Sequence, residues 1–186
     1  MEQENNNNKF SLSVFFKKNK IKLLVIISLI ILIIFGIIIL DEVNKNKVAK
    51  LSETFNKAQI LIKNDKKDEA LNSLKKIINQ NETFYSPSAL NLIIENNLIK
   101  DEDKIIYLFN QILKDTKLDE ETKNLIIIKK TFFIGDKIEE ADLLKTFKPI
   151  IQSNSIWKST ASDYIKKYYI SKREFEKAKE FKFENK

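Results

Sequence analysis

Two patterns of apolar residues divide this chain of 186 residues. In the first, residues 23–40 follow one another with only Ser28 mildly polar. A helix of that length extends about 27 Å at roughly 1.5 Å per residue, which spans the core of a bilayer. In the second, apolar residues recur at three- and four-residue spacing, as in amphipathic helices. The patterns predict an all-α protein with one transmembrane helix at residues 21–40 and a helical domain at residues 41–186.

Two other interpretations of the apolar run fit less well. A buried core helix normally keeps a polar face over five turns, and this run has none. A cleaved signal peptide normally has a shorter apolar region that ends at a small-x-small site. This run ends instead with Ile38, Ile39, Leu40, Asp41 and Glu42. We therefore expect the segment to stay attached as a membrane anchor.

Charges on either side of the run predict its orientation. Four lysines precede it and two acidic residues follow it: Lys17, Lys18, Lys20 and Lys22, then Asp41 and Glu42. Lysines favour the cytoplasmic side, although Lys45, Lys47 and Lys50 reduce the asymmetry. We expect a single-pass protein with a cytoplasmic N-terminus, and the asparagine run at residues 5–8 predicts a disordered tail at residues 1–20.

The rest of the chain has the features of helices throughout, because only two prolines and one glycine interrupt it. Start signals are an N-cap serine before proline, two capping-box spacings and two acidic clusters: Ser86–Pro87, Asp136–Glu139, Ser171–Glu174, Asp101–Asp103 and Asp119–Glu121. The expected helices cover residues 43–63, 67–79, 87–98, 102–114, 119–134, 137–151, 156–170 and 172–183. A strand near residues 125–133 is the alternative there, but Leu125, Ile128 and Phe132 share a helical face.

These helices pair into about four antiparallel hairpins, which start near residues 48, 87, 120 and 156. An interval in the mid-thirties is that of a tetratricopeptide repeat (TPR). The first hairpin fits best, because Ala70 follows Ala58 by twelve residues and Leu74 continues the face. Small residues at these two positions allow the helices of one repeat to approach closely. A short TPR-like solenoid is expected, with a non-repetitive helical bundle as the alternative.

Later hairpins match the repeat less closely. Ala141 and Ala178 fall at the second small position, but Lys129 and Lys166 occupy the first. The residues predicted to pack the repeats are Ala58, Ala70, Leu74, Ala89, Ala141, Trp157, Ala161 and Ala178.

Three segments resemble the YfgM-like tetratricopeptide-repeat family, and its alphaproteobacterial members in particular. The segments are FYSPSALNLIIENNLIKDEDKIIYLFNQI, LDEETKNLIIIKKTFFIGD and LKTFKPIIQSNSIWKSTASDYIKKYYISKREFEKAKEF. Phe147, Pro149, Trp157 and Ala161 stand where that family has its proline turn and the tryptophan that packs the last hairpin. Members are single-span proteins of the bacterial inner membrane associated with the Sec translocon. The resemblance implies a periplasmic domain that binds translocon subunits, exported proteins or envelope proteins.

Charge does not point to a nucleic-acid partner. The net charge is +7, but the segment before the apolar run holds five lysines and two glutamates, and the rest holds 28 basic and 24 acidic residues. Arg173 is the sole arginine, whereas base and phosphate recognition favour the guanidinium group. No nucleic-acid binding is expected.

Residue types leave little room for catalysis. The chain has no cysteine and no histidine, and its two glycines form no phosphate-binding loop. Glu139 and Glu140 are adjacent, so a helix points them to different sides. We expect no enzyme activity, no metal site and no cofactor.

Aromatic residues gather near the C-terminus. Trp157, Tyr164 and Tyr168 share one helical face, and the preferred interpretation is the core of the last hairpin. Tyr169 turns away from that face and, with Phe55 of the first hairpin, is a predicted partner contact. The leading hypothesis is a chaperone-like interaction module, and the alternative is an architectural scaffold of envelope assembly or cell division that self-associates as a homo-oligomer.

Overall fold

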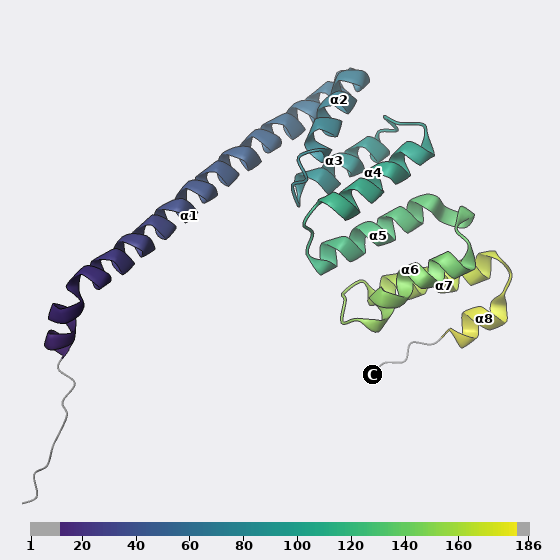
Figure 1. Ribbon diagram of the computed structural model, residues 1–186. Helices are drawn as coiled ribbons and strands as arrows, with labels where there is room; N and C mark the ends of the chain where they lie inside the picture. The colour runs from purple at the N-terminus through teal and green to yellow at the C-terminus, as the bar shows by residue number, and fades with distance from the viewer. Residues whose placement is uncertain (1–11, 182–186) are drawn as a thin grey trace, which may run out of the picture. The chain divides into compact units, whose positions relative to one another are not determined.

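The structure, a computed structural model, describes residues 12–181, apart from the side chains of residues 12–19 and 23 (Figure 1). Its elements are α1 (Leu12–Lys63), α2 (Lys67–Ile78), α3 (Tyr85–Glu95), α4 (Glu102–Asp115), α5 (Glu120–Ile134), the 3-10 helix η1 (Gly135–Lys137), α6 (Glu140–Gln152), α7 (Lys158–Ser171) and α8 (Phe175–Glu180). No strand occurs within that range, so the predicted all-α class is confirmed.

The chain divides after Ala49 into two units. The first contains most of α1, which is long and apolar enough to cross a membrane. Its described apolar side chains between residues 24 and 40 are 50% to 70% exposed. The described atoms of this unit leave the apolar surface uncovered, as expected for a helix surrounded by lipid.

Two boundaries differ from the sequence-based expectation. Helix α1 already includes residues 12–20, which were predicted to belong to a disordered tail, while the asparagine run at residues 5–8 lies outside the described residues. Nor does the helix end between the apolar run and residue 43. The polar residues there continue the helix through local pairs, since Asp41 bonds Lys45 at 2.7 Å.

Helices α2 to α8 of the second unit pack in chain order, each against the next (Figure 1). Their apolar faces form two clusters. The buried residues of the first cluster are Leu51, Ala58, Leu74, Ile77, Ile78, Ala89, Leu90, Ile93, Ile99, Ile105, Leu108, Phe109, Ile112 and Ile126. Those of the second cluster are Ile128, Ile138, Leu143, Phe147, Ile150, Ala161, Ile165, Tyr168 and Tyr169. Helix α5 contributes to both, because Ile126 and Ile128 point to different sides of it.

Three helices of this unit end in the same turn. After α1, the N–H of Asp65 bonds the carbonyl of Ile62 and the N–H of Lys66 bonds that of Leu61. The same bonding offsets recur after α3 and after α7. The central residues Asp65, Asn97 and Arg173 have positive φ angles of 57°, 50° and 62°, as in a Schellman motif. Helix α5 ends differently, at Gly135 with φ 60° and ψ −135°.

The acidic start signals are confirmed. The Asp101 carboxylate accepts hydrogen bonds from the N–H groups of Asp103 and Lys104 at the start of α4. That of Asp119 accepts one from the N–H of Thr122 at the start of α5. Each satisfies backbone donors that a helix N-terminus leaves unpaired.

The other start signals were wrong. Helix α3 begins at Tyr85, where the carboxylate of Glu82 accepts the N–H groups of Phe84 and Tyr85 at 2.8 and 2.5 Å. Ser86 is instead fully buried, and its hydroxyl lies 3.2 Å from the carbonyl oxygen of Ile77 in α2. It therefore joins two helices rather than capping one.

The two capping boxes do not form. Glu139 and Glu174 are themselves the N-cap residues of α6 and α8, without a side-chain cap bond. Asp136 lies in η1, and the Ser171 hydroxyl bonds the carbonyl of Tyr168 within α7. A capping box needs its serine or aspartate at the N-cap and its glutamate three residues later, and both helices begin too late for that arrangement.

Candidate protein-binding groove

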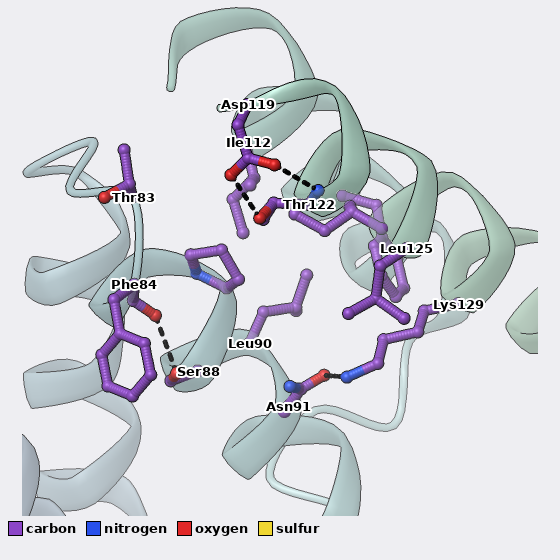
Figure 2. Close-up of a pocket in the computed structure, with 13 residues that line it drawn as sticks. Thr83, Phe84, Ser88, Leu90, Asn91, Ile112, Asp119, Thr122, Leu125 and Lys129 are labelled. Carbon is purple, nitrogen blue, oxygen red and sulfur yellow. Dashed lines mark hydrogen bonds between the residues drawn. The ribbon is translucent and has the colours of Figure 1, made fainter. Parts of the chain in front are cut away.

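Helices α3 and α5 both pack against α4 and leave a groove between them, of about 330 Å³. It is lined by Thr83, Phe84, Pro87, Ser88, Leu90, Asn91, Phe109, Ile112, Asp119, Thr122, Leu125, Ile126 and Lys129 (Figure 2). The volume lies at the lower end of the range for ligand sites, roughly 300 to 1,000 Å³. We call this the α3–α5 groove.

The floor of the groove belongs to the first cluster. Leu90, Phe109, Ile112 and Ile126 line it and are at most 3% exposed. Helical spacing explains their position, because Phe109 and Ile112 share one face of α4, turned toward α3 and α5. Leu125, next to Ile126, is only half-buried and forms part of the wall. The groove is thus an open edge of a packed core.

Asp119 provides a negative charge at one end. Its two carboxylate oxygens accept hydrogen bonds from the Thr122 N–H at 2.9 Å and the Thr122 hydroxyl at 2.6 Å. These bonds, first that of the hydroxyl and then that of the N–H, lower the pKa of the Asp119 carboxyl below its usual value of 3.8. The carboxylate is therefore ionised at neutral pH.

Lys129 provides a positive charge at the other end. The residue is half-buried, and its ammonium group donates to the Oδ1 atom of Asn91 at 3.2 Å. Figure 2 shows Lys129 and Asn91 meeting at the end of the groove opposite Asp119, with Leu90 and Leu125 between. Helix α5 supplies both charges and α3 supplies the amide.

Aromatic rings extend the apolar surface beyond the groove. Phe84 lines the rim and is 65% exposed. Its ring packs edge-on against Tyr85 at 5.1 Å, and Tyr85 contacts Phe55 of α1 at 5.9 Å. Phe55, a predicted partner contact, is therefore half-buried and linked to the rim through Tyr85.

Tyr169, the other predicted contact, is 5% exposed, so the expectation that it is exposed was wrong. Helix α8 covers the side of α7 that the sequence left open. Phe181 lies 6.3 Å from the Tyr169 ring, and the Lys177 ammonium lies 5.4 Å above it. The Tyr169 hydroxyl donates to Glu140 at 3.0 Å. Burial, then this hydrogen bond, raises the pKa of Tyr169 above 10.0.

The predicted repeat-packing residues occupy three kinds of environment. Five are fully buried: Ala58, Ala70, Leu74, Ala89 and Ala161. Trp157 and Ala178 are half-buried beside the second cluster. Ala141 is exposed, contrary to expectation. It precedes the buried Leu143 by two residues, which is about 200° around a helix, so it faces away from the core.

Sequence reasoning did not identify the groove. Asp119 was assigned only a capping role, and Lys129 was treated as a misfit at a small-residue position. A lysine in the middle of a half-buried helix face, where the repeat pattern expects a small residue, was the one available signal. Within residues 12–181, no three acidic residues are arranged to hold a metal ion.

The chain matches no protein-family model, no curated protein and no solved structure. The evidence for function therefore comes from the geometry of the groove and from the apolar part of α1.

Proposed function

We propose that this protein is a membrane-tethered, TPR-like protein–protein interaction module whose partners bind in the α3–α5 groove. The observation that carries the proposal is an open groove with a buried apolar floor and charged ends, on a chain whose α1 is long and apolar enough to span a membrane. Apolar surface with a few polar groups that fix orientation is typical of binding sites. On this proposal the protein binds its partners without turning them over, and it uses no cofactor.

Turn geometry supports the repeat assignment. Positive-φ residues follow α1, α3, α5 and α7 at positions 65, 97, 135 and 173, spaced by 32, 38 and 38 residues, and a fifth, Asn81, lies between α2 and α3. Three of the four carry the same Schellman hydrogen bonds. Regular turns joining helices that pack in chain order are expected of a helical solenoid. Four hairpins would then be α1–α2, α3–α4, α5–α6 and α7–α8, with the groove between the first helices of the middle two.

The lysines before the apolar run support a cytoplasmic N-terminus in a bacterial inner membrane, with the helical domain in the periplasm. The resemblance to the YfgM-like family supports the same side. It also supports translocon subunits, exported proteins or envelope proteins as partners. The proposed role is to hold such proteins close to the membrane while they are exported or assembled.

The test of groove binding is a comparison of captured partners. Full-length tagged protein is purified from membranes of producing cells, and the co-purifying proteins are quantified by mass spectrometry. Leu125→Arg places a charged side chain in the groove wall and should lower recovery of translocon or exported proteins at least tenfold. The control Lys145→Ala, exposed on α6 and outside the groove lining, should not. Equal recovery from both variants would contradict the proposal.

Topology has a separate test, because the chain contains no cysteine. Single cysteines replace Asn6 and Lys57, one on each side of the apolar run. A membrane-impermeant maleimide added to intact spheroplasts should label Lys57→Cys and spare Asn6→Cys. Labelling of Asn6→Cys alone would place the domain in the cytoplasm.

A second candidate, the architectural scaffold, is favoured by two exposed apolar side chains near the turn from α7 to α8, which together we call the apolar patch. Ile170 is 52% exposed and Phe175, at the start of α8, is 53% exposed. Such a patch can support self-association. The double substitution Ile170→Ser and Phe175→Ser should convert oligomers of the full chain into monomers in light scattering, if this candidate holds. A wild-type monomer would exclude it.

A further inference from the structure

The two charged groups of the α3–α5 groove have no oppositely charged partner. Asp119 is bonded through Thr122, and Lys129 through Asn91, but neither forms an ion pair within residues 12–181. Other lysines of the same domain do pair, such as Lys177 with Glu140 at 2.9 Å. An ammonium group carries three donors, and Lys129 uses one of them on Asn91. Both ends of the groove can therefore accept a charge from a ligand.

The spacing of these charges is set by α5. Asp119 is the N-cap of the helix and Lys129 lies ten residues further on, so the two backbones are about 15 Å apart at 1.5 Å per residue. An extended chain covers about 3.3 Å per residue. Ligand residues that meet the two ends are then four or five positions apart.

The size of the groove favours an extended ligand. A helix is about 10 to 12 Å in diameter with its side chains, whereas an extended chain can direct single side chains into a groove from alternate positions. The groove holds about 330 Å³. One apolar side chain directed at Leu90 and Leu125 fits this volume, while the extended backbone that carries it runs along the open side of the groove.

We propose that the groove selects an extended segment of a partner protein in which an acidic and a basic residue lie four or five positions apart on either side of an apolar residue. The ligand carboxylate bonds Lys129 and the Asn91 amide, and the ligand cation bonds Asp119. The apolar side chain covers the floor between them. The inference rests on the proposed function, because it specifies which protein segments the groove binds.

Selection from a peptide library tests the motif. Full-length protein in nanodiscs is exposed to displayed random twelve-residue peptides, and the bound peptides are sequenced. Wild-type protein should enrich peptides with an acid and a base four or five positions apart around an apolar residue. One enriched peptide is then synthesised, and its affinity is measured by fluorescence anisotropy.

Neutral variants test which charge of the groove recognises which charge of the ligand. Lys129→Gln should remove the preference for the acid, and Asp119→Asn the preference for the base. Each substitution should lower the affinity for the synthetic peptide about tenfold, as expected when a hydrogen bond to a charged group is lost. Asparagine is also a good N-cap, so α5 keeps its start, which far-UV circular dichroism verifies. The exposed neighbours Glu120→Gln and Lys123→Gln serve as matched controls and should bind like the wild type.

Three results would overturn the motif: no enrichment, enrichment without paired charges, or enrichment of amphipathic helical peptides. None of them depends on partner capture with Leu125→Arg, which tests groove binding without reference to charge. If Leu125→Arg lowers partner capture but the peptide selection finds no such motif, the proposed function stands and this specificity is rejected. Failure of both rejects the groove as a binding site.

Discussion

The buried residues of the first cluster are aliphatic except for Phe109, whereas those of the second include Phe147, Tyr168 and Tyr169. The tyrosines bring polar groups into the core. The Tyr168 hydroxyl donates to the Ile138 carbonyl at 3.2 Å, and that of Tyr169 to Glu140 at 3.0 Å. The buried side chains of the first cluster are therefore apolar throughout, while two of those in the second also form hydrogen bonds.

A charged side chain, that of Lys177, also contacts the second cluster. Lys177 of α8 bonds Glu140 of α6 and Glu174, at 2.9 and 2.7 Å. These hydrogen bonds, that of Glu140 first, raise the pKa of Lys177 well above its usual value of 10.5. None of the residues of the first cluster, which forms the groove floor, belongs to an ion pair. A change of pH that alters these charges should therefore destabilise the C-terminal helices before it destabilises the helices of the groove.

The largest expected effect is that of Phe147→Ala. Phe147 is fully buried, and its removal leaves a cavity, so the free energy of unfolding should fall by about 3 to 5 kcal/mol. Urea unfolding of the full chain in detergent micelles measures this, followed by the fluorescence of Trp157, the sole tryptophan. Ile60→Ala, 58% exposed in α1, should change stability by less than about 0.5 kcal/mol. Equal effects would show that the second cluster is not a packed core.

A smaller loss is expected for Ala70→Leu. Ala70 is fully buried in α2, and the added atoms should cost about 1 to 3 kcal/mol through overpacking. Ala141→Leu is the matched control, because the exposed Ala141 has room for the larger side chain. Urea unfolding compares the two. A greater loss at Ala141 would contradict the exposure of Ala141 in the structure and favour its predicted packing role.

Alkaline pH should separate the two clusters. Burial raises the pKa of Tyr164 and of Tyr169 above 10.0, so their neutral forms favour the folded state. That contribution is complete below pH 10 and is lost as pH rises through the higher folded pKa values. Trp157 fluorescence, which reports the second cluster, should therefore change at lower pH than helix content by circular dichroism. Tyr169→Phe should move the fluorescence change to higher pH, and coincident changes in the wild type would contradict the comparison.

The smallest expected effect is a gain. Ser162 is fully buried in α7, and its hydroxyl has no hydrogen-bond partner among the described residues. Ser162→Ala removes this unsatisfied group and should raise the free energy of unfolding by about 1 kcal/mol. Ser88→Ala is the comparison, because the Ser88 hydroxyl donates to the Phe84 carbonyl at 2.7 Å. Destabilisation by Ser162→Ala would show that the hydroxyl is satisfied in solution.

Much of the secondary structure could be predicted from the sequence, because the information is local. Helical spacing and the acidic caps Asp101 and Asp119 place most helix starts within a few residues of the observed ones. The start of α3 differs because the reach of Glu82 to two backbone N–H groups decides it. A glutamate two or three residues before a helix is not a pattern that local preferences single out. The repeat type and the family stay predictions.

The groove could not be predicted, because it depends on a gap between two helices that are distant in sequence. Leu90 and Ile126 look like ordinary core residues, and only the packing of α3 and α5 on α4 leaves them at the base of an opening. Tyr169 was misplaced for a related reason. Its exposure depends on whether α8 folds back over α7. The periodicity of α7 alone cannot indicate that.

Photo-crosslinking in cells tests the central claim, that partner proteins occupy the groove, most directly. A benzophenone amino acid replaces Leu125 in the groove or Ile170 in the apolar patch of the full chain, and adducts are identified by mass spectrometry after irradiation. The account predicts adducts of Leu125 with other proteins, among them translocon subunits or exported chains. Adducts formed only at Ile170, and only between two copies of this chain, would contradict it.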